Sequence, residues 1–163
     1  MSIMKRLVLW AILALLLLPA GARAQRLPAC DLKDNQGKTL SSASLADHQT
    51  PFAITFWASW CHPCLMELSA LTDMAPDWEK PLRIYAICED DARSLSRAKA
   101  LAADSDWPVT VLYDDKQELA KALSVSSIPH VFVFDKDGKR IFTHIGYAPG
   151  DEEILVQKLL EAQ

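Results

Sequence analysis

The sequence predicts an α/β domain with a mixed central sheet flanked by helices. Short apolar runs rich in strand-forming residues alternate along the chain with stretches whose apolar residues repeat at helical spacing. After the last alternation come a turn, a pairing strand and a closing helix. The chain has 163 residues, of which 50% are apolar and 23% are charged, as is usual for one globular domain. A domain of this size buries a core without the help of disulfides.

Residues 26–47 form an irregular N-terminal section in which we expect a β-hairpin. Asp34-Asn35-Gln36-Gly37 is a turn signal between two short extended pieces. Residues 44–47 have the length of a single helical turn. The apolar run from Phe52 to Ala58 follows, and it is short enough to be a buried strand.

The pattern then changes to that of a helix from residue 63 to about residue 78. Leu65, Leu68 and Leu71 fall on one face at this spacing. Pro76 is expected to kink or end the helix, because proline has no N–H to donate.

A second buried strand is predicted at residues 82–88, and Asp90 or Asp91 then caps a helix that runs to about residue 103. The remaining predicted elements are a strand at 109–113, a short helix at 117–123, a strand at 130–134, a strand at 139–145 and the closing helix at 151–161.

Residues 1–24 are expected to be a cleaved secretory signal, which leaves residues 25–163 as the domain. Lys5 and Arg6 precede an apolar run from Leu7 to Leu18, and residues 22–24 have the small-x-small pattern that a signal peptidase recognises. The run is shorter than the roughly 20 residues of a transmembrane helix.

The sequence leaves two other interpretations of the N-terminus open. The apolar run could remain as an uncleaved anchor. Alternatively, Leu27-Pro28-Ala29-Cys30 is similar to a lipoprotein cleavage box, in which Cys30 would carry the lipid. In either case the protein would be attached to a membrane.

Removal of residues 1–24 takes away three basic residues and no acidic one, so the net charge changes from −4 to −7. An acidic protein of this kind has no general affinity for nucleic acid or for anionic membrane surfaces. Export also places the four cysteines in an environment where thiols become disulfides.

The pair Cys61-His62-Pro63-Cys64 has three interpretations. A zinc site would need a second pair of ligands, and the sequence has no second C-x-x-C. A structural disulfide would close a very small loop and constrain the unfolded chain little. A redox pair fits best, because Cys61 follows a buried strand and starts a helix, whose dipole favours the thiolate. Cys64 would resolve the mixed disulfide, and Pro63 suits the first helical turn.

Residues 56–64, Phe-Trp-Ala-Ser-Trp-Cys-His-Pro-Cys, resemble the active-site signature of the thioredoxin superfamily, and more narrowly that of the exported TlpA/ResA-type thiol-disulfide reductases. Further segments that resemble this family are residues 27–29, 31–32, 37–39, 127–129, 137–139 and Gly146. The resemblance therefore covers nearly the whole mature chain. It implies a thioredoxin fold with an N-terminal β-hairpin extension.

The resemblance also implies roles for single residues. Cys61 would be the nucleophile and Cys64 the resolving thiol, joined in a redox disulfide. Pro129, preceded by Ile128, would be the cis-proline that faces them and shapes the groove for a partner's backbone. Trp57 and Trp60 would shield the site, although both are equally compatible with plain core positions.

Two further positions influence the chemistry. Thioredoxin has a buried Asp where this chain has Thr55, which cannot act as a base. TlpA/ResA-type relatives have a Glu at the position of Glu67, three residues after Cys64 on one helix face. A partly buried Glu67 would accept the proton of Cys64, whereas a solvated one would have no such role. His62 would favour an oxidase if its charge stabilised the thiolate, but the order His-Pro and the family favour a reductase.

The resemblance implies a periplasmic protein thiol-disulfide oxidoreductase that works as a disulfide reductase and needs no cofactor or metal. Its partners would be exported proteins, oxidised or reduced, and a membrane-embedded electron donor, as in cytochrome c biogenesis. A disulfide oxidase or isomerase would use the same site. A Cu(I)-handling protein is a third alternative, with Cys61, Cys64, His62, Met66 and His130 as soft ligands.

The other two cysteines, Cys30 and Cys88, also allow two interpretations. The N-terminal hairpin could bring Cys30 to the face of the sheet where Cys88 lies, and a structural Cys30–Cys88 disulfide would then form. Otherwise Cys88 is a buried apolar residue and Cys30 a spare thiol.

Overall fold

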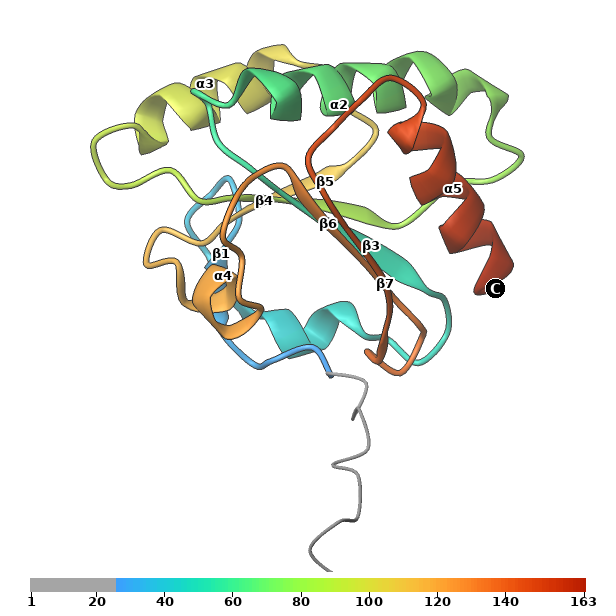
Figure 1. The fold of residues 1–163 in the computed structure, drawn as a ribbon. Coiled ribbons are helices and arrows are strands. Elements are labelled where there is room, and N and C mark those ends of the chain that lie inside the picture. Colours follow the sequence, from blue (N-terminus) through green and yellow to red (C-terminus); the bar gives the residue numbers. More distant parts are fainter. Residues whose placement is uncertain (1–25) are drawn as a thin grey trace, which may run out of the picture.

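The computed structural model describes residues 26–163, so the predicted signal at residues 1–24 lies outside the described residues. The chain forms one seven-stranded sheet in the order β2-β1-β5-β4-β3-β6-β7 (Figure 1). The strands are β1 (Asp31–Lys33), β2 (Thr39–Ser41), β3 (Phe52–Trp57), β4 (Ile84–Cys88), β5 (Thr110–Tyr113), β6 (His130–Phe134) and β7 (Arg140–Ile145). The helices are η1 (Ser42–Leu45), α2 (His62–Met74), η2 (Ala75–Asp77), α3 (Leu95–Asp104), α4 (Glu118–Ala122) and α5 (Asp151–Glu161).

The sheet is mixed, as predicted. Strands β3, β4 and β5 run parallel, while β6, β7, β1 and β2 pair antiparallel with their neighbours. All six residues of β3 are buried, because this strand lies between β4 and β6 and is covered on both faces. The carboxyl ends of β3 and β4 meet at the same edge of the sheet, and Cys61 follows β3 at that edge.

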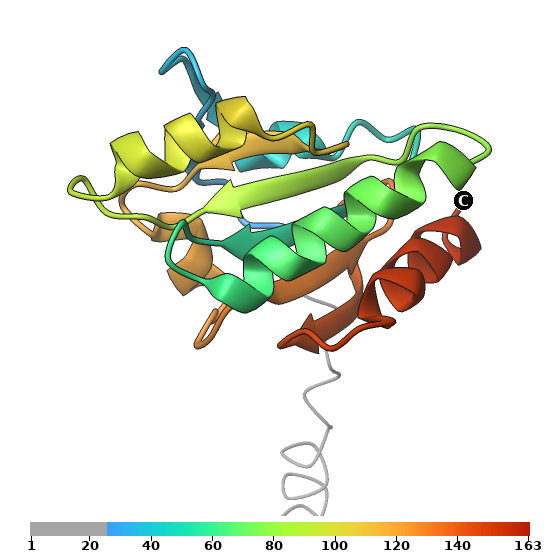
Figure 2. The same cartoon turned by 90° about the horizontal axis from the view of Figure 1, so that it is seen from above.

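Helices cover both faces of the sheet. Helices α2, α3 and α5 lie on one face, and α4 and η1 lie on the other (Figure 1). Seen from above, α2 lies between α3 and α5 (Figure 2). The alternation of side chains along β3 divides the core between the two faces: Trp57 packs with residues of α2 and α3, and Phe56 packs with residues of α4.

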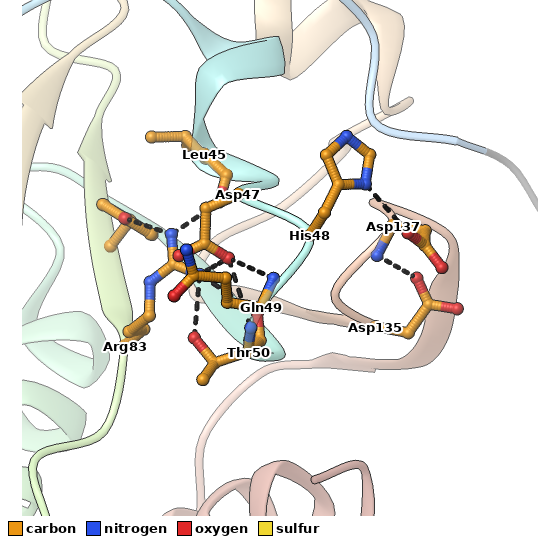
Figure 3. Close-up of polar contacts among 9 residues, drawn as sticks. Leu45, Asp47, His48, Gln49, Thr50, Arg83, Asp135 and Asp137 are labelled. Carbon is orange, nitrogen blue, oxygen red and sulfur yellow. Dashed lines mark hydrogen bonds and ion pairs between the residues drawn. The ribbon is translucent and has the colours of Figure 1, made fainter.

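The N-terminal section is tied to the sheet by Arg83, which directly precedes β4. Its guanidinium donates hydrogen bonds to the carbonyl of Leu45 (2.7 Å), to the carbonyl and hydroxyl of Thr50 (3.0 and 3.1 Å) and to the hydroxyl of Tyr85 (3.1 Å). It also pairs with Asp47 at 2.8 Å. Figure 3 shows Arg83 reaching into this loop. The network lies where β4 begins, at the edge of the sheet opposite Cys61.

A second contact joins the same loop to the β6–β7 turn. Nδ1 of His48 lies 2.8 Å from Oδ1 of Asp137, and both side chains are exposed (Figure 3). The turn itself is closed by Asp135, whose Oδ1 accepts from the backbone N–H groups of Asp137 (3.0 Å) and Lys139 (2.9 Å).

Two predicted helices differ from the structure in their bounds. The helix expected to reach residue 78 ends at Met74, and Pro76 lies in the short η2 that follows. The helix expected to begin after Asp90 or Asp91 begins only at Leu95, because Asp91 accepts bonds from the N–H groups of Arg93 (3.0 Å) and Ser94 (3.2 Å) in a preceding turn. The single turn expected at 44–47 is η1, two residues earlier.

Within residues 26–163, no helix combines the length and the apolar character that crossing a bilayer requires.

Candidate active site

The structure joins Cys61 and Cys64 in a disulfide at the start of α2. The two sulfur atoms are 2.02 Å apart and the Cα atoms 5.3 Å apart. Cys61 is the N-cap of the helix, and its Sγ accepts a hydrogen bond from the backbone N–H of Cys64 at 3.3 Å. Pro63 lies in the first turn, where its missing N–H has no cost. The helix terminus therefore places positive partial charge at the sulfur of Cys61.

The two sulfurs differ in accessibility. Cys61 is 5% exposed, whereas Cys64 is fully buried against the core. Only Cys61 can be reached by a thiol or disulfide on another protein. Cys64 has no exposed surface, so a partner has no direct access to its sulfur.

The residues around the disulfide are divided between surface and core. Trp60 is 63% exposed, and His62 and Pro63 are also exposed. Trp57 is fully buried and packs edge-on against Trp107 with ring centroids 5.1 Å apart. Of the two tryptophans considered as shields of the site, only Trp60 can therefore contact a partner.

Glu67 lies beneath the disulfide on the same helix and is 2% exposed. Its Oε2 accepts a hydrogen bond from the hydroxyl of Thr55 on β3 at 2.6 Å. Burial is the main cause that raises the pKa of Glu67 from 4.5 to about 7, and the charges of Asp151 and Glu152 add to it. The Thr55 hydrogen bond acts in the opposite direction. Thr55 thus positions the carboxyl, and Glu67 is a group that can hold or release a proton near neutral pH.

A second buried carboxylate, Asp90, holds the loop that leads into Cys61. Its Oδ2 accepts from the backbone N–H of Ser59 at 2.6 Å, and its Oδ1 accepts from the Ser59 hydroxyl at 2.8 Å. The thiol of Cys88 lies 3.3 Å from Oδ2 and donates to it. Burial acts against the charged form, but hydrogen bonds from Ser94 and Ser59 outweigh it and hold the pKa of Asp90 below its usual range.

Sequence reasoning assigned Asp90 only as a helix cap and gave Ser59 no role. A usable signal was present, however. Asp90 follows β4 as Ser59 follows β3, and the two strands are parallel neighbours whose carboxyl ends meet. Polar residues directly after two such strands are therefore brought together near Cys61.

Pro129 lies at the start of β6, and the bond between Ile128 and Pro129 is cis. The carbonyl of Pro129 accepts from the N–H of Gly146 at 2.8 Å, which ties this segment to the end of β7. Ile128 and Trp60 both line a groove of about 380 Å³ at the surface. The other residues that line it are Glu89, Gln117, Ala120, Lys121, Val125, Ser126 and Ser127.

Cys30 and Cys88 are both free thiols, so the structural disulfide considered from the sequence is not formed in the structure. The reason is the alternation of side chains in the sheet. Cys88 belongs to the core cluster under α2 and α3, whereas Cys30 packs against the cluster on the other face, which contains Ile87. Burial raises the pKa of the Cys88 thiol strongly, so this thiol is unreactive.

His130, one of the soft ligands considered for copper, does not join the dithiol. Its ring stacks on Phe132 with centroids 4.2 Å apart, and its Nε2 lies 3.0 Å from the hydroxyl of Thr143. Phe132 belongs to the core face opposite Cys64. Among residues 26–163, no three His, Cys, Asp or Glu side chains are grouped so that they could hold a metal ion.

Residues 24–140 match the AhpC/TSA family. Among curated relatives, the thiol-disulfide oxidoreductase ResA of Bacillus cereus is 30% identical over 94 residues, which are 57% of this chain and 53% of the relative. The chain thus spans about half the length of this relative.

Solved structures show the same fold over a larger part of the chain. A thioredoxin-like protein from Porphyromonas gingivalis matches with a TM-score of 0.71 and 36% identity, covering 83% of this chain and 90% of that one. A putative thiol:disulfide interchange protein DsbE from Chlorobium tepidum matches with a TM-score of 0.70 and 23% identity, covering 86% and 96%. The expected thioredoxin fold is confirmed.

Proposed function

This chain belongs to the AhpC/TSA family, and on that premise we propose that it is an exported, periplasmic protein thiol-disulfide oxidoreductase that works as a disulfide reductase. One observation carries the proposal: a redox disulfide at a helix N-terminus has one accessible sulfur, Cys61, and a buried carboxyl, Glu67, on the helix below the other. Relatives that are named thiol-disulfide oxidoreductase support the reaction class.

The reaction requires two exchange steps. The reduced Cys61 thiolate attacks a disulfide of the partner, and one partner sulfur leaves as a thiolate. Cys64 then gives its proton to the Glu67 carboxylate and attacks the Cys61 sulfur of the mixed disulfide. The second partner sulfur leaves, so the partner has gained two electrons and Cys61–Cys64 is oxidised. A donor dithiol must return these two electrons, and we propose a membrane-embedded donor for this step.

The direction of electron flow follows from the stability of the thiolates. A dithiol whose thiolates are strongly stabilised is oxidising. The charge of His62 is screened by water because the side chain is exposed, so it stabilises the Cys61 thiolate only weakly. The buried Glu67 disfavours a second negative charge at Cys64. Both features favour a reductase over an oxidase or isomerase.

Exported proteins with disulfides are the proposed substrates, including apocytochrome c in cytochrome c biogenesis. The groove beside Trp60 and Ile128 offers an extended peptide a surface next to Cys61. The N-terminal signal proposed at residues 1–24 would deliver the protein to the periplasm.

The decisive measurement is the reduction potential of the Cys61–Cys64 pair at equilibrium with a thiol buffer. A variant with Cys30 and Cys88 replaced by serine isolates the pair. A potential near or below about −230 mV supports the reductase, and a potential near about −120 mV would show an oxidase instead. Cys61→Ser should abolish exchange, whereas Cys64→Ser should accumulate a mixed disulfide with the substrate. If Cys64→Ser reduces substrate as fast as the wild type, the assignment of the two thiols is wrong.

A further inference from the structure

The proposed reaction leaves a proton on Glu67 in each cycle, and that proton must reach solvent before the next cycle. Glu67 is 2% exposed, and its Oε2 is occupied by the Thr55 hydroxyl at 2.6 Å. On the side of the dithiol, Cys64 is fully buried in the disulfide, so it offers the proton of Glu67 no path to solvent. The surroundings of Glu67 on the side of β7 and α5 provide another way out.

A cavity of about 10 Å³ lies beside Glu67 at this position. It is lined by Glu67, Val131, Phe142, His144, Asp151, Ile154 and Leu155. A volume of this size corresponds to about one water molecule. Only Glu67, His144 and Asp151 among the lining residues have polar side chains, and three polar partners are the number that a buried water typically has.

His144 and Asp151 connect this cavity to the surface. Nε2 of His144 on β7 lies 3.0 Å from Oδ2 of Asp151, the first residue of α5. The same Oδ2 accepts from the N–H of Ala148 at 2.7 Å, which fixes the carboxylate in place. The side chains are 38% and 20% exposed, so the pair contacts both the cavity and bulk water.

We propose that the His144–Asp151 pair is the proton relay between Glu67 and solvent. The proton leaves the Glu67 carboxyl for a water molecule that occupies the cavity, and that water passes one of its own protons to the pair. The pair then releases a proton to bulk water and returns to its starting state. The relay rests on the proposed function, because only the exchange reaction delivers protons to Glu67.

The charges around Glu67 are compatible with proton transfer from Glu67 to the His144–Asp151 pair. Asp151 and Glu152 approach it from the start of α5, and Tyr147 approaches from the β7–α5 loop. From its own helix Glu67 faces Cys64, and from β3 it faces the neutral Thr55. Among the residues that line the cavity, only His144 has a side chain that can become positively charged. The nearby carboxylates attract a proton to this region, and His144 can accept it.

The test compares His144→Ala with His48→Ala, since His48 forms the other exposed His–Asp pair, with Asp137, at the opposite edge of the sheet. The readout is the steady-state rate at which a disulfide substrate is reduced with a dithiol donor in excess, because the proton must leave Glu67 between successive cycles. We expect His144→Ala to lower this turnover rate by about tenfold or more, imidazole in the buffer to restore it, and His48→Ala to leave it unchanged. Imidazole rescue separates proton transfer from a structural role.

Asp151→Asn is the second variant, because it keeps an oxygen for the hydrogen bonds while removing the charge. It should lower the same turnover rate, and it tests the relay on its own if His144→Ala does not fold. Turnover at the wild-type rate in the folded variants, or slowing that imidazole does not relieve, would overturn the relay. A wild-type protein that performs no exchange would instead overturn the proposed function.

Discussion

Burial of Glu67 should make the stability of the oxidised protein depend on pH in a way that Glu67→Gln removes. Burial first, and then Asp151 and Glu152, raise the pKa of this carboxyl from 4.5 to about 7. A tenfold change in proton affinity is worth about 1.4 kcal/mol. The ionised carboxyl therefore destabilises the fold by about 3 kcal/mol relative to its protonated form.

The sign follows from the number of protons bound in each state. Below pH 4.5 the carboxyl is protonated in both the folded and the unfolded chain, so it contributes nothing. Between pH 4.5 and about 7 the unfolded chain loses the proton while the folded chain keeps it, and stability falls as the pH rises. Above this range the loss stays constant.

Urea unfolding of the oxidised wild type and of Glu67→Gln, at about pH 4 and about pH 8, measures this loss. Gln stays neutral and still accepts the bond from Thr55. The variant's free energy of unfolding should gain about 3 kcal/mol on the wild type between the two pH values, because other titrating groups cancel in the difference. Glu79→Gln, at an exposed position, is the matched control and should show no such gain. A gain of less than about 0.5 kcal/mol for Glu67→Gln would refute burial as the cause of the raised pKa.

Three further experiments test other parts of the structure. Asp90→Asn weakens the hydrogen bonds from Ser59, so it should lower the free energy of unfolding in urea by about 2 kcal/mol and slow exchange at Cys61. Unchanged exchange kinetics would show that Asp90 does not position the active-site loop. Arg83→Ala should cost about 2 kcal/mol without changing exchange, because the network it breaks lies at the opposite edge of the sheet; a change in exchange rate would contradict this. Gly138→Ala and Gly37→Ala both place a side chain at positive φ, which costs about 1 kcal/mol. Gly138→Ala should cost more, because its new Cβ would lie 3.2 Å from Cβ of Ala46, whereas nothing lies within 4 Å at Gly37; equal losses of stability would refute this contact.

The elements of the fold were largely predictable because their signals are local. The apolar run at β3, the helical spacing of α2 and the turn between β6 and β7 each depend on neighbours in the sequence. The errors occurred at helix ends. Asp91 was expected to start a helix, but its side chain closes a separate turn with Arg93 and Ser94. The Asp91 carboxylate accepts backbone hydrogen bonds equally well in a turn and at a helix start, so the sequence does not distinguish the two.

The site was predictable in its chemistry and less so in its surroundings. Cys61 and Cys64 are three residues apart, and their place between a buried strand and a helix favoured the pairing that the structure shows. Glu67 could be placed on the face of Cys64, but its burial depends on Thr55 and on α5, which are distant in the sequence. Sequence spacing therefore could not show whether the Glu67 side chain is solvated or buried beneath the disulfide.

Contacts between distant segments were decided only when the sheet assembled. A strand's side chains alternate between two faces, so the strand order and register determine that Cys30 and Cys88 lie on opposite sides. The same assembly brings Asp90 to Ser59, and His144 and Asp151 to Glu67. Local sequence patterns thus specify the elements and the reactive dithiol. The proton affinities and partners around that dithiol depend on burial and distance, which arise only from packing across the chain.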